Sequence, residues 1–159
     1  MWWSDRRAFL LGLAALPACG FEPVYGPNSQ TTALIGKIDV APPSDEEGFQ
    51  LVSRLKARLG EDGGPWLLTA AIELDEEAVG ILPDGTITRY NVEGAVAWQL
   101  SDGEIVLTSG REESFTSYTA TSTTVATIFA RRDANTRLMT ILADRIVAEL
   151  LRTAADWMP

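Results

Sequence analysis

The sequence predicts an α+β two-layer sandwich, in which two helices pack on one face of a small, mostly antiparallel, mixed sheet of four strands. Three observations support this fold class. Two segments place leucine or isoleucine at every fourth position, alternating apolar segments lie between them, and Asp-Gly turns separate those segments. The predicted order is β-α-β-β-β-α, which is typical of two-layer α+β domains. The chain has no internal repeat, so residues 33–159 are expected to form a single domain.

The first strand and the first helix are predicted between residues 34 and 60. Residues 34–41 contain alternating apolar positions and are followed by Pro42-Pro43, which indicates a short strand. Ser44 with Glu47 three residues later has the form of a capping box, so a helix is expected to begin here. Glycine at position 60 is expected to end it. Its apolar stripe consists of Leu51, Leu55 and Leu59, with Phe49 and Val52 beside them.

Three longer strands are predicted over residues 66–75, 86–100 and 105–118. Asp-Gly turns at residues 83–86 and 101–104 separate the second strand from its neighbours, because glycine adopts positive φ and aspartate binds the backbone of the turn. Side chains alternate between the two faces of a sheet. The apolar parity therefore predicts the core face, with Trp66, Leu68, Ala70, Ile72, Leu74, Tyr90, Val92, Val96, Trp98 and Leu100 on it.

A long helix is predicted over residues 125–152. Leu138, Leu142, Ile146 and Leu150 are spaced by four, which is the spacing of one helix face. The threonine-rich segment 120–127 before it has no clear pattern. Two positions for Trp157-Met158 fit the sequence, one packed on this helix and one in contact with a partner.

The N-terminal segment predicts a lipid anchor on Cys19, the only cysteine of the chain. Two arginines precede nine apolar residues, and a small-residue cleavage site ends at this cysteine, as in a bacterial lipoprotein signal. The apolar run is too short to cross a membrane. We therefore expect residues 1–18 to be removed and residues 19–32 to form an extended, lipidated tether. Sec and twin-arginine export both fit the leader, and Gly20 favours sorting to the outer membrane.

Composition narrows the functions that are expected. The formal net charge of −9 disfavours nucleic acid and polybasic membrane binding, so no nucleic-acid partner is predicted. Histidine is absent and the single cysteine is expected to hold lipid. The usual acid–base group, thiol nucleophile and zinc ligands are then missing. The sequence therefore predicts no enzyme, no catalytic residue, no metal site and no cofactor apart from the covalent lipid.

The mature chain resembles the lipopolysaccharide-assembly lipoprotein family, LptE. Its start, Cys19-Gly20-Phe21-Glu22-Pro23-Val24-Tyr25, is similar to the Cys-Gly-Phe-x-Pro-Leu-Tyr start of that family. Further similar stretches lie at residues 88–92, 117–120, 132–135 and 142–146. The resemblance implies a non-catalytic outer-membrane lipoprotein that faces the periplasm and the lumen of an LptD-type β-barrel. Such a protein plugs the barrel, helps it to assemble and aids lipopolysaccharide delivery to the outer leaflet.

Four arginines are candidates for contact with lipopolysaccharide or with the partner barrel, because guanidinium groups bind phosphate and carboxylate in a bidentate manner. They are Arg89, Arg111, Arg131 and Arg132. The competing interpretations are a cross-strand pair between Arg89 and a residue such as Glu113, and simple solvation of the others. The acidic pairs Glu76-Glu77 and Glu112-Glu113 should point to opposite faces of their strands, so they are not expected to form a paired-carboxylate site.

A second function fits the same sequence. A free-standing lipoprotein could bind a small apolar ligand or lipid, which requires an apolar cavity of about 300 Å³ or more between sheet and helices. A barrel plug should instead have a filled core. A lipid-anchored hydrolase that uses carboxylates is a third, weaker alternative.

Overall fold

The computed structural model describes residues 34–61, 63–120 and 123–158. These belong to one compact unit, Leu34–Pro159, which is separate from Met1–Ala33. The predicted signal peptide, the tether and Cys19 lie outside the described residues.

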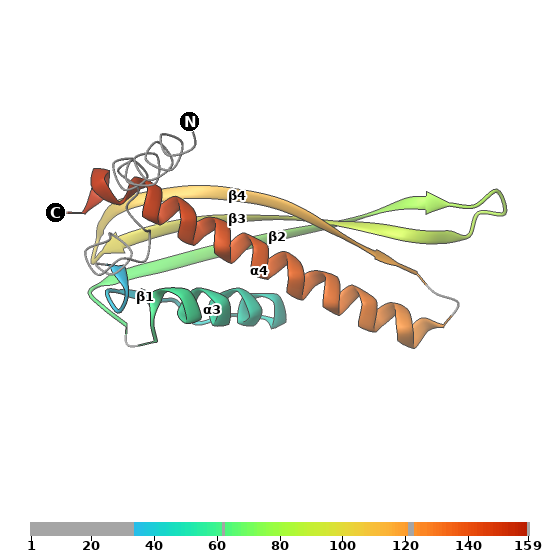
Figure 1. The fold of residues 1–159 in the computed structure, drawn as a ribbon, viewed down its shortest axis with the longest axis horizontal. Coiled ribbons are helices and arrows are strands. Elements are labelled where there is room, and N and C mark those ends of the chain that lie inside the picture. Colours follow the sequence, from blue (N-terminus) through green and yellow to red (C-terminus); the bar gives the residue numbers. More distant parts are fainter. Residues whose placement is uncertain (1–33, 62, 121–122, 159) are drawn as a thin grey trace, which may run out of the picture. The chain divides into compact units, whose positions relative to one another are not determined.

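Four strands form one mixed sheet in the order β1-β2-β3-β4 (Figure 1). They are β1 (Ile38–Val40), β2 (Trp66–Ile81), β3 (Ile87–Asp102) and β4 (Ile105–Thr119). β1 is parallel to the start of β2, and the other neighbours are antiparallel. The predicted α+β fold class and its element order are therefore confirmed.

β2 is longer than the sequence predicted. It extends to Ile81 rather than ending at residue 75, although the alternation of apolar residues is lost in its second half. β3 supplies the reason, because its residues pair with β2 as far as Ile87 opposite Ile81, with a bulge after Ala78. Backbone pairing with a neighbouring strand thus extends a strand whose side chains alone do not indicate one.

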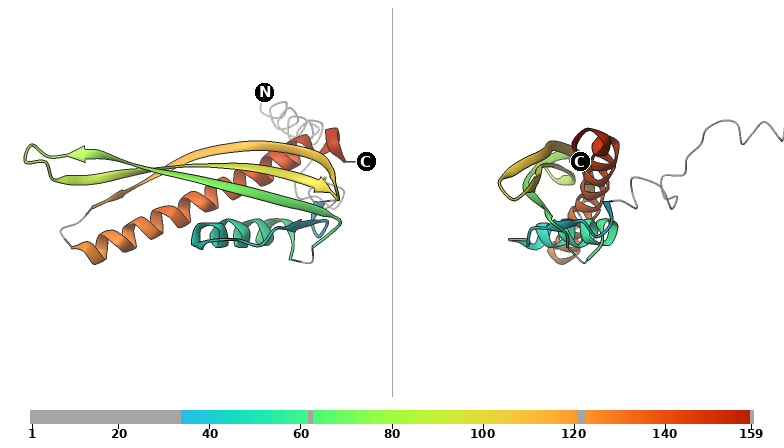
Figure 2. Two further views of the ribbon diagram at one scale, coloured as in Figure 1. Left: turned by 180° about the vertical axis from the view of Figure 1, so that it is seen from behind. Right: turned by 90° about the vertical axis from the view of Figure 1, so that its left-hand side faces the viewer.

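Both helices cover the same face of the sheet, as the end-on view in Figure 2 shows. α3 spans Glu46–Leu59 and α4 spans Thr124–Trp157. The N-cap of α3 is Asp45, whose Oδ1 accepts a hydrogen bond from the Gly48 amide at 2.7 Å, so the predicted Ser44 cap is wrong by one residue. The carboxylate of Asp45 is the stronger acceptor for an amide of the first turn, and Ser44 Oγ donates to it instead.

α4 continues past the predicted end at residue 152 because its last turn is packed. Trp157 is 9% exposed and meets Trp66 edge-to-face, with ring centroids 5.3 Å apart. Its Nε1 donates to Thr153 Oγ1 at 3.2 Å. Of the two positions that fit the sequence for Trp157, the structure has the one packed within the domain.

The core lies between the sheet and the two helices and consists mainly of residues of the predicted faces. Ala70 and Leu74, which the alternation predicted on the core face, are exposed. Trp98 is 3% exposed and Trp66 is 6% exposed, which confirms both as core residues. Tyr90 is half-buried at the edge of this core. The fully buried large side chains are Leu34, Ile38, Leu51, Leu55, Leu59, Leu68, Leu100, Leu138, Met139, Leu142, Ile146 and Leu150.

Candidate functional site

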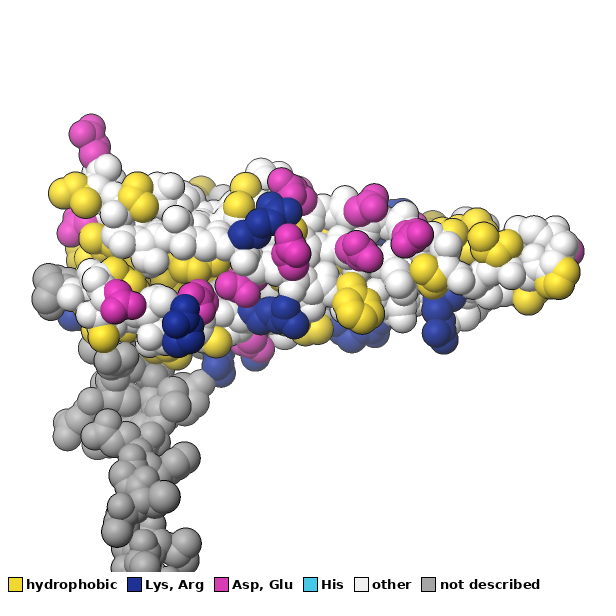
Figure 3. Space-filling view, turned by 90° about the horizontal axis from the view of Figure 1, so that it is seen from above, with side chains coloured by type: hydrophobic (Ala, Val, Ile, Leu, Met, Phe, Trp, Pro, Cys, Tyr) yellow, Lys and Arg dark blue, Asp and Glu magenta, His cyan; other side chains and the backbone are white. Residues whose placement is uncertain are grey.

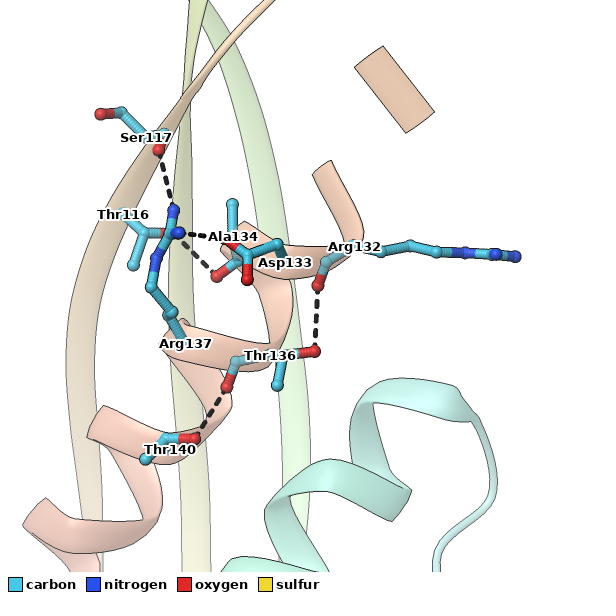
Figure 4. A network of polar contacts seen from close by, with 8 residues as sticks. All are labelled: Thr116, Ser117, Arg132, Asp133, Ala134, Thr136, Arg137 and Thr140. Atoms are coloured by element: carbon cyan, nitrogen blue, oxygen red, sulfur yellow. Dashed lines mark hydrogen bonds and ion pairs between the residues drawn. The ribbon is translucent and has the colours of Figure 1, made fainter. Parts of the chain in front are cut away.

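Hydrogen bonds join α4 to β4, the edge strand of the sheet. Arg137 donates to the Ser117 carbonyl at 3.2 Å, and Arg145 donates to the Glu113 carbonyl. Eight residues of helix rise about 12 Å and four residues of strand about 13 Å, so these spacings match. Figure 4 shows Arg137 beside Ser117. The Thr116 hydroxyl also donates to the carbonyl of Ala134 on α4, at 3.1 Å. Side chains of α4 thus hydrogen-bond to carbonyls of the edge strand, which are then not available for pairing with a further strand.

Two of the four candidate arginines are engaged within the domain. Arg111 reaches Glu73 at 2.7 Å and Glu113 at 3.0 Å, across the outer face of the sheet. This arginine lowers the pKa of Glu73 through a hydrogen bond and its positive charge, and the two carboxylates raise the pKa of Arg111. Arg132 lies 3.8 Å from Glu46 of α3. Figure 4 shows its side chain extending away from β4.

The other two candidates, Arg89 and Arg131, lie toward the end of the sheet that holds the β2–β3 turn. Arg89 is opposite Thr119 on β4, whereas Glu113 is opposite Ala95, so the suggested cross-strand pair of Arg89 with Glu113 is wrong. Within the described residues no ion pair involves Arg89 or Arg131. The four arginines therefore do not form one cluster, and their contact with a ligand or partner stays a prediction.

Exposed apolar side chains gather at the same end of the unit, a feature that the sequence pattern did not predict. Figure 3 shows hydrophobic side chains at the tapering end, with few charged groups among them. The signal in the sequence is a stretch without charge, residues 115–130, that leads into α4. The exposed residues are Val79, Ile81 and Leu82 from the hairpin and Val125, Ile128 and Phe129 from α4.

Tyr90 and Tyr118 stack behind this apolar end. Their ring centroids are 5.3 Å apart and their planes differ by 17°. Burial and the nearby Glu76 carboxylate raise the pKa of Tyr118 to about 12, because both disfavour a phenolate. Tyr118 belongs to the buried core, and Tyr90 packs against that core as a partly buried residue.

Two hollows at the surface of the described residues are large enough to hold a ligand. One, of about 450 Å³, lies on the outer face of the sheet and is lined by acidic residues, Arg111 and Phe115. The other, of about 360 Å³, lies between α3 and β2, beside the end of β1, and includes Pro42, Val52 and Ile72. It also includes Ser44 and Asp45, so its lining is mixed rather than apolar.

The described residues offer no arrangement of three or more Asp, Glu, His or Cys side chains that could hold a metal ion. Of the helices in this part of the chain, none has a stretch long and apolar enough to cross a membrane.

The fold and this surface define a two-layer α+β domain of a kind seen in solved bacterial lipoproteins. A protein from Caulobacter crescentus described as a lipoprotein matches with a TM-score of 0.65 at 20% identity, covering 82% of this chain and 99% of that one. Rare lipoprotein B from Shewanella oneidensis matches with a TM-score of 0.58 at 16% identity, covering 76% and 96%. A minor lipoprotein from Acinetobacter baumannii matches with a TM-score of 0.52 at 15% identity, covering 74% and 90%. At these identities the likeness shows the fold alone.

The family follows from a sequence model rather than from shape. The model of the lipopolysaccharide-assembly family LptE matches residues 35–150, so this chain belongs to that family. No curated protein matched the chain.

Proposed function

We propose that this chain is an outer-membrane lipoprotein, anchored by lipid on Cys19, that plugs an LptD-type β-barrel and helps it to assemble. In this role it aids delivery of lipopolysaccharide to the outer leaflet and catalyses no reaction. Membership of the lipopolysaccharide-assembly family is the observation that carries the proposal. The charged outer surface of the domain supports it, since large barrels can hold a plug in a polar lumen.

The geometry of the unit supports a reach into the barrel. The chain enters at Leu34, beside the start of β2, and the β2–β3 turn lies at the opposite end (Figure 1). A strand of the length of β2 spans about 50 Å. The tether from Cys19 to Leu34 can also span at most about 50 Å. A lipid anchor at the membrane surface therefore permits the apolar end of the domain, with Arg89 and Arg131, to lie deep in the lumen of a barrel. There the apolar side chains could contact the acyl chains of lipopolysaccharide, and the two guanidinium groups could contact its phosphates.

Affinity purification of the full, tagged chain from detergent-solubilised membranes tests the proposal. We expect an LptD-type barrel to be recovered with it in a stoichiometric amount. A tagged, unrelated outer-membrane lipoprotein from the same cells is the control, and it should recover none. Failure to recover the barrel with this chain would defeat the proposal.

The alternative, a free-standing lipoprotein that binds a small apolar ligand or lipid, has one structural observation in its favour. The hollow of about 360 Å³ beside β2 has a suitable size, although Ser44 and Asp45 line part of it. Saturable binding of a fatty acid by the full chain would support this alternative if a Val52→Trp substitution, which fills the hollow, abolished it. We expect no saturable binding.

A further inference from the structure

The outer face of the sheet, which looks away from both helices, is covered by no described element. We call it the open face and define it by alternate positions of three strands: residues 69–77 of β2, 91–99 of β3 and 109–117 of β4, in each case the odd-numbered ones. The register places them in rows across the sheet. The three long strands carry eight acidic residues against two arginines, so the acidic excess of the domain lies largely in this sheet.

One row of the open face is electrostatically satisfied. It contains Glu73, Ala95 and Glu113, with the two carboxylates on either side of a small alanine. Arg111 from the adjacent row bridges both carboxylates, at 2.7 and 3.0 Å. The repulsion that two carboxylates would feel across the alanine is thus offset within the domain.

The negative charges of the next row are not balanced by a basic residue of the described part of the chain. Asp75 lies directly opposite Glu93, and like charges at this cross-strand position are destabilising. Within the described residues no ion pair involves either of them. The third member of the row is Phe115, opposite Glu93 on the other side and 66% exposed. A pair of carboxylates beside an exposed aromatic ring fits a cation, since carboxylates and ring faces both attract one.

The row also borders a hollow. The volume of about 450 Å³ is lined by all three members of this row and by the satisfied row with Arg111. Ala95 is part of the lining and is 9% exposed, so a small side chain stands here between the larger Glu73 and Glu113. This space accommodates a lysine or arginine side chain that approaches from outside the sheet.

We infer that the open face is the surface by which the domain docks against a basic stretch of its partner barrel, with a lysine or arginine of the barrel wall between Asp75, Glu93 and Phe115. This inference rests on the proposed function, because it names the surface that meets the proposed partner. Charge complementarity favours a basic partner, because the unpaired carboxylates of this row would repel an anionic lipid. The exposed ring of Phe115 favours a protein partner over water, because contact with a partner would bury it.

The test uses the full, tagged lipoprotein and recovery of the barrel from membranes. The key variant is Asp75→Asn with Glu93→Gln, which keeps both side-chain shapes and removes the charges. The matched control is Glu61→Gln with Glu104→Gln, two exposed acids at the end where the chain enters. A second variant, Phe115→Ser, leaves every charge in place.

We expect barrel recovery to fall about tenfold for the Asp75/Glu93 variant and to fall for Phe115→Ser, while the control recovers the barrel like the unmodified chain. The melting temperature of the Asp75/Glu93 variant should rise by about 2 °C, because a like-charge pair is removed. A loss of recovery together with higher stability cannot come from misfolding.

Recovery at the unmodified level for the Asp75/Glu93 variant would overturn the inference and leave the proposed function standing. An equal loss in the control would also overturn it, because net charge rather than this row would then be responsible. If the unmodified chain recovers no barrel, the proposed function itself fails and the inference falls with it.

Discussion

Arg54 of α3 and Asp144 of α4, which are 90 positions apart in the sequence, form a bidentate pair that joins the two helices. Arg54 Nε lies 3.0 Å from Asp144 Oδ1, and Arg54 Nη2 lies 2.8 Å from Asp144 Oδ2. Arg58, one helical turn further along α3, lies 3.5 Å from the same carboxylate. One acidic residue on α4 therefore holds two arginines of α3, so the two helices are fixed in register above the sheet.

The first prediction concerns this pair. An Asp144→Asn substitution should reduce the free energy of unfolding by about 1 kcal/mol, because it leaves two guanidinium groups without their shared carboxylate at a partly exposed site. Urea denaturation of the variant measures this. Asp156→Asn, an exposed acid on the same helix, should change stability by less than about 0.5 kcal/mol. Equal stabilities for the two variants would contradict the role given to Asp144.

The second prediction concerns Gly110, which lies directly opposite Trp98. A Cβ added at Gly110 would lie 2.6 Å from Cζ2 of this buried indole. Gly110→Ala should therefore destabilise the domain by about 1–3 kcal/mol, since the ring is held between sheet and helices and has little room to move. Ser109→Ala, at the neighbouring exposed position, is the control. A melting temperature of the Gly110 variant equal to that of the control would show that the ring relaxes freely.

The third prediction concerns alkaline pH. The pKa of Tyr118 is raised to about 12 by burial and by the Glu76 carboxylate, whereas an unfolded tyrosine ionises near 10. Above pH ~10 the unfolded chain loses this proton first, so the contribution to stability is full below that pH. It is lost between pH ~10 and ~12 and amounts to at most about 3 kcal/mol.

A comparison with Tyr118→Phe isolates this contribution from the other groups that titrate at high pH. From pH ~10 to ~12 the unfolding free energy of the unmodified protein should fall relative to that of Tyr118→Phe. Denaturant titration at each pH measures both values. Titration of the phenolate absorbance gives the same pKa directly. A Tyr118 that ionised near pH 10 in the folded protein would refute the environment described here.

The fourth prediction concerns the anchor. Cys19→Ala should release the chain from membranes in cells that lack the partner barrel, because the lipid is proposed as its attachment. Cell fractionation measures whether the chain is attached to the membrane, and the mass of the mature chain shows whether it carries lipid. In cells that contain the barrel, part of the variant should still sediment with membranes through its partner. Retention by membranes in the absence of the barrel would count against a lipid anchor.

The fifth prediction concerns lipopolysaccharide. Arg89→Ala with Arg131→Ala should weaken binding of lipopolysaccharide to the purified protein by about tenfold, because two charge-assisted contacts to phosphate would be lost. Arg152→Ala is the control, since Arg152 pairs with Glu149 on α4. A binding assay with immobilised protein in detergent separates these cases. Unchanged affinity in the double variant would remove both arginines from the proposed contact.

Much of the fold could be predicted because it depends on local signals. The fourfold leucine spacing of α3 and α4, the alternation in β3 and the turn at Gly103, with φ of 58°, are each encoded within a few residues. The burial of Trp66 and Trp98 follows from the same alternation. Boundaries were predicted less well, because the second half of β2 and the last turn of α4 depend on partners distant in the sequence.

The candidate surfaces show the same division. The arginines could be listed from composition and resemblance, but the sequence did not show which of them the domain already pairs. Only the register placed Arg111 between Glu73 and Glu113 and left Asp75 facing Glu93. Such neighbours come from different strands, and a shift of one residue would have sent each side chain to the other face.

By itself, then, the sequence determined the class of fold and the element order, because periodicity and turn residues are local properties of the chain. The predicted signal at Cys19 and the lipid attachment expected there also rest on local sequence alone. The tertiary structure decided which charges neutralise one another, which apolar residues stay exposed at the hairpin end and which face of the sheet remains uncovered. These properties depend on strand register and helix packing, which arise from contacts between residues far apart in the sequence.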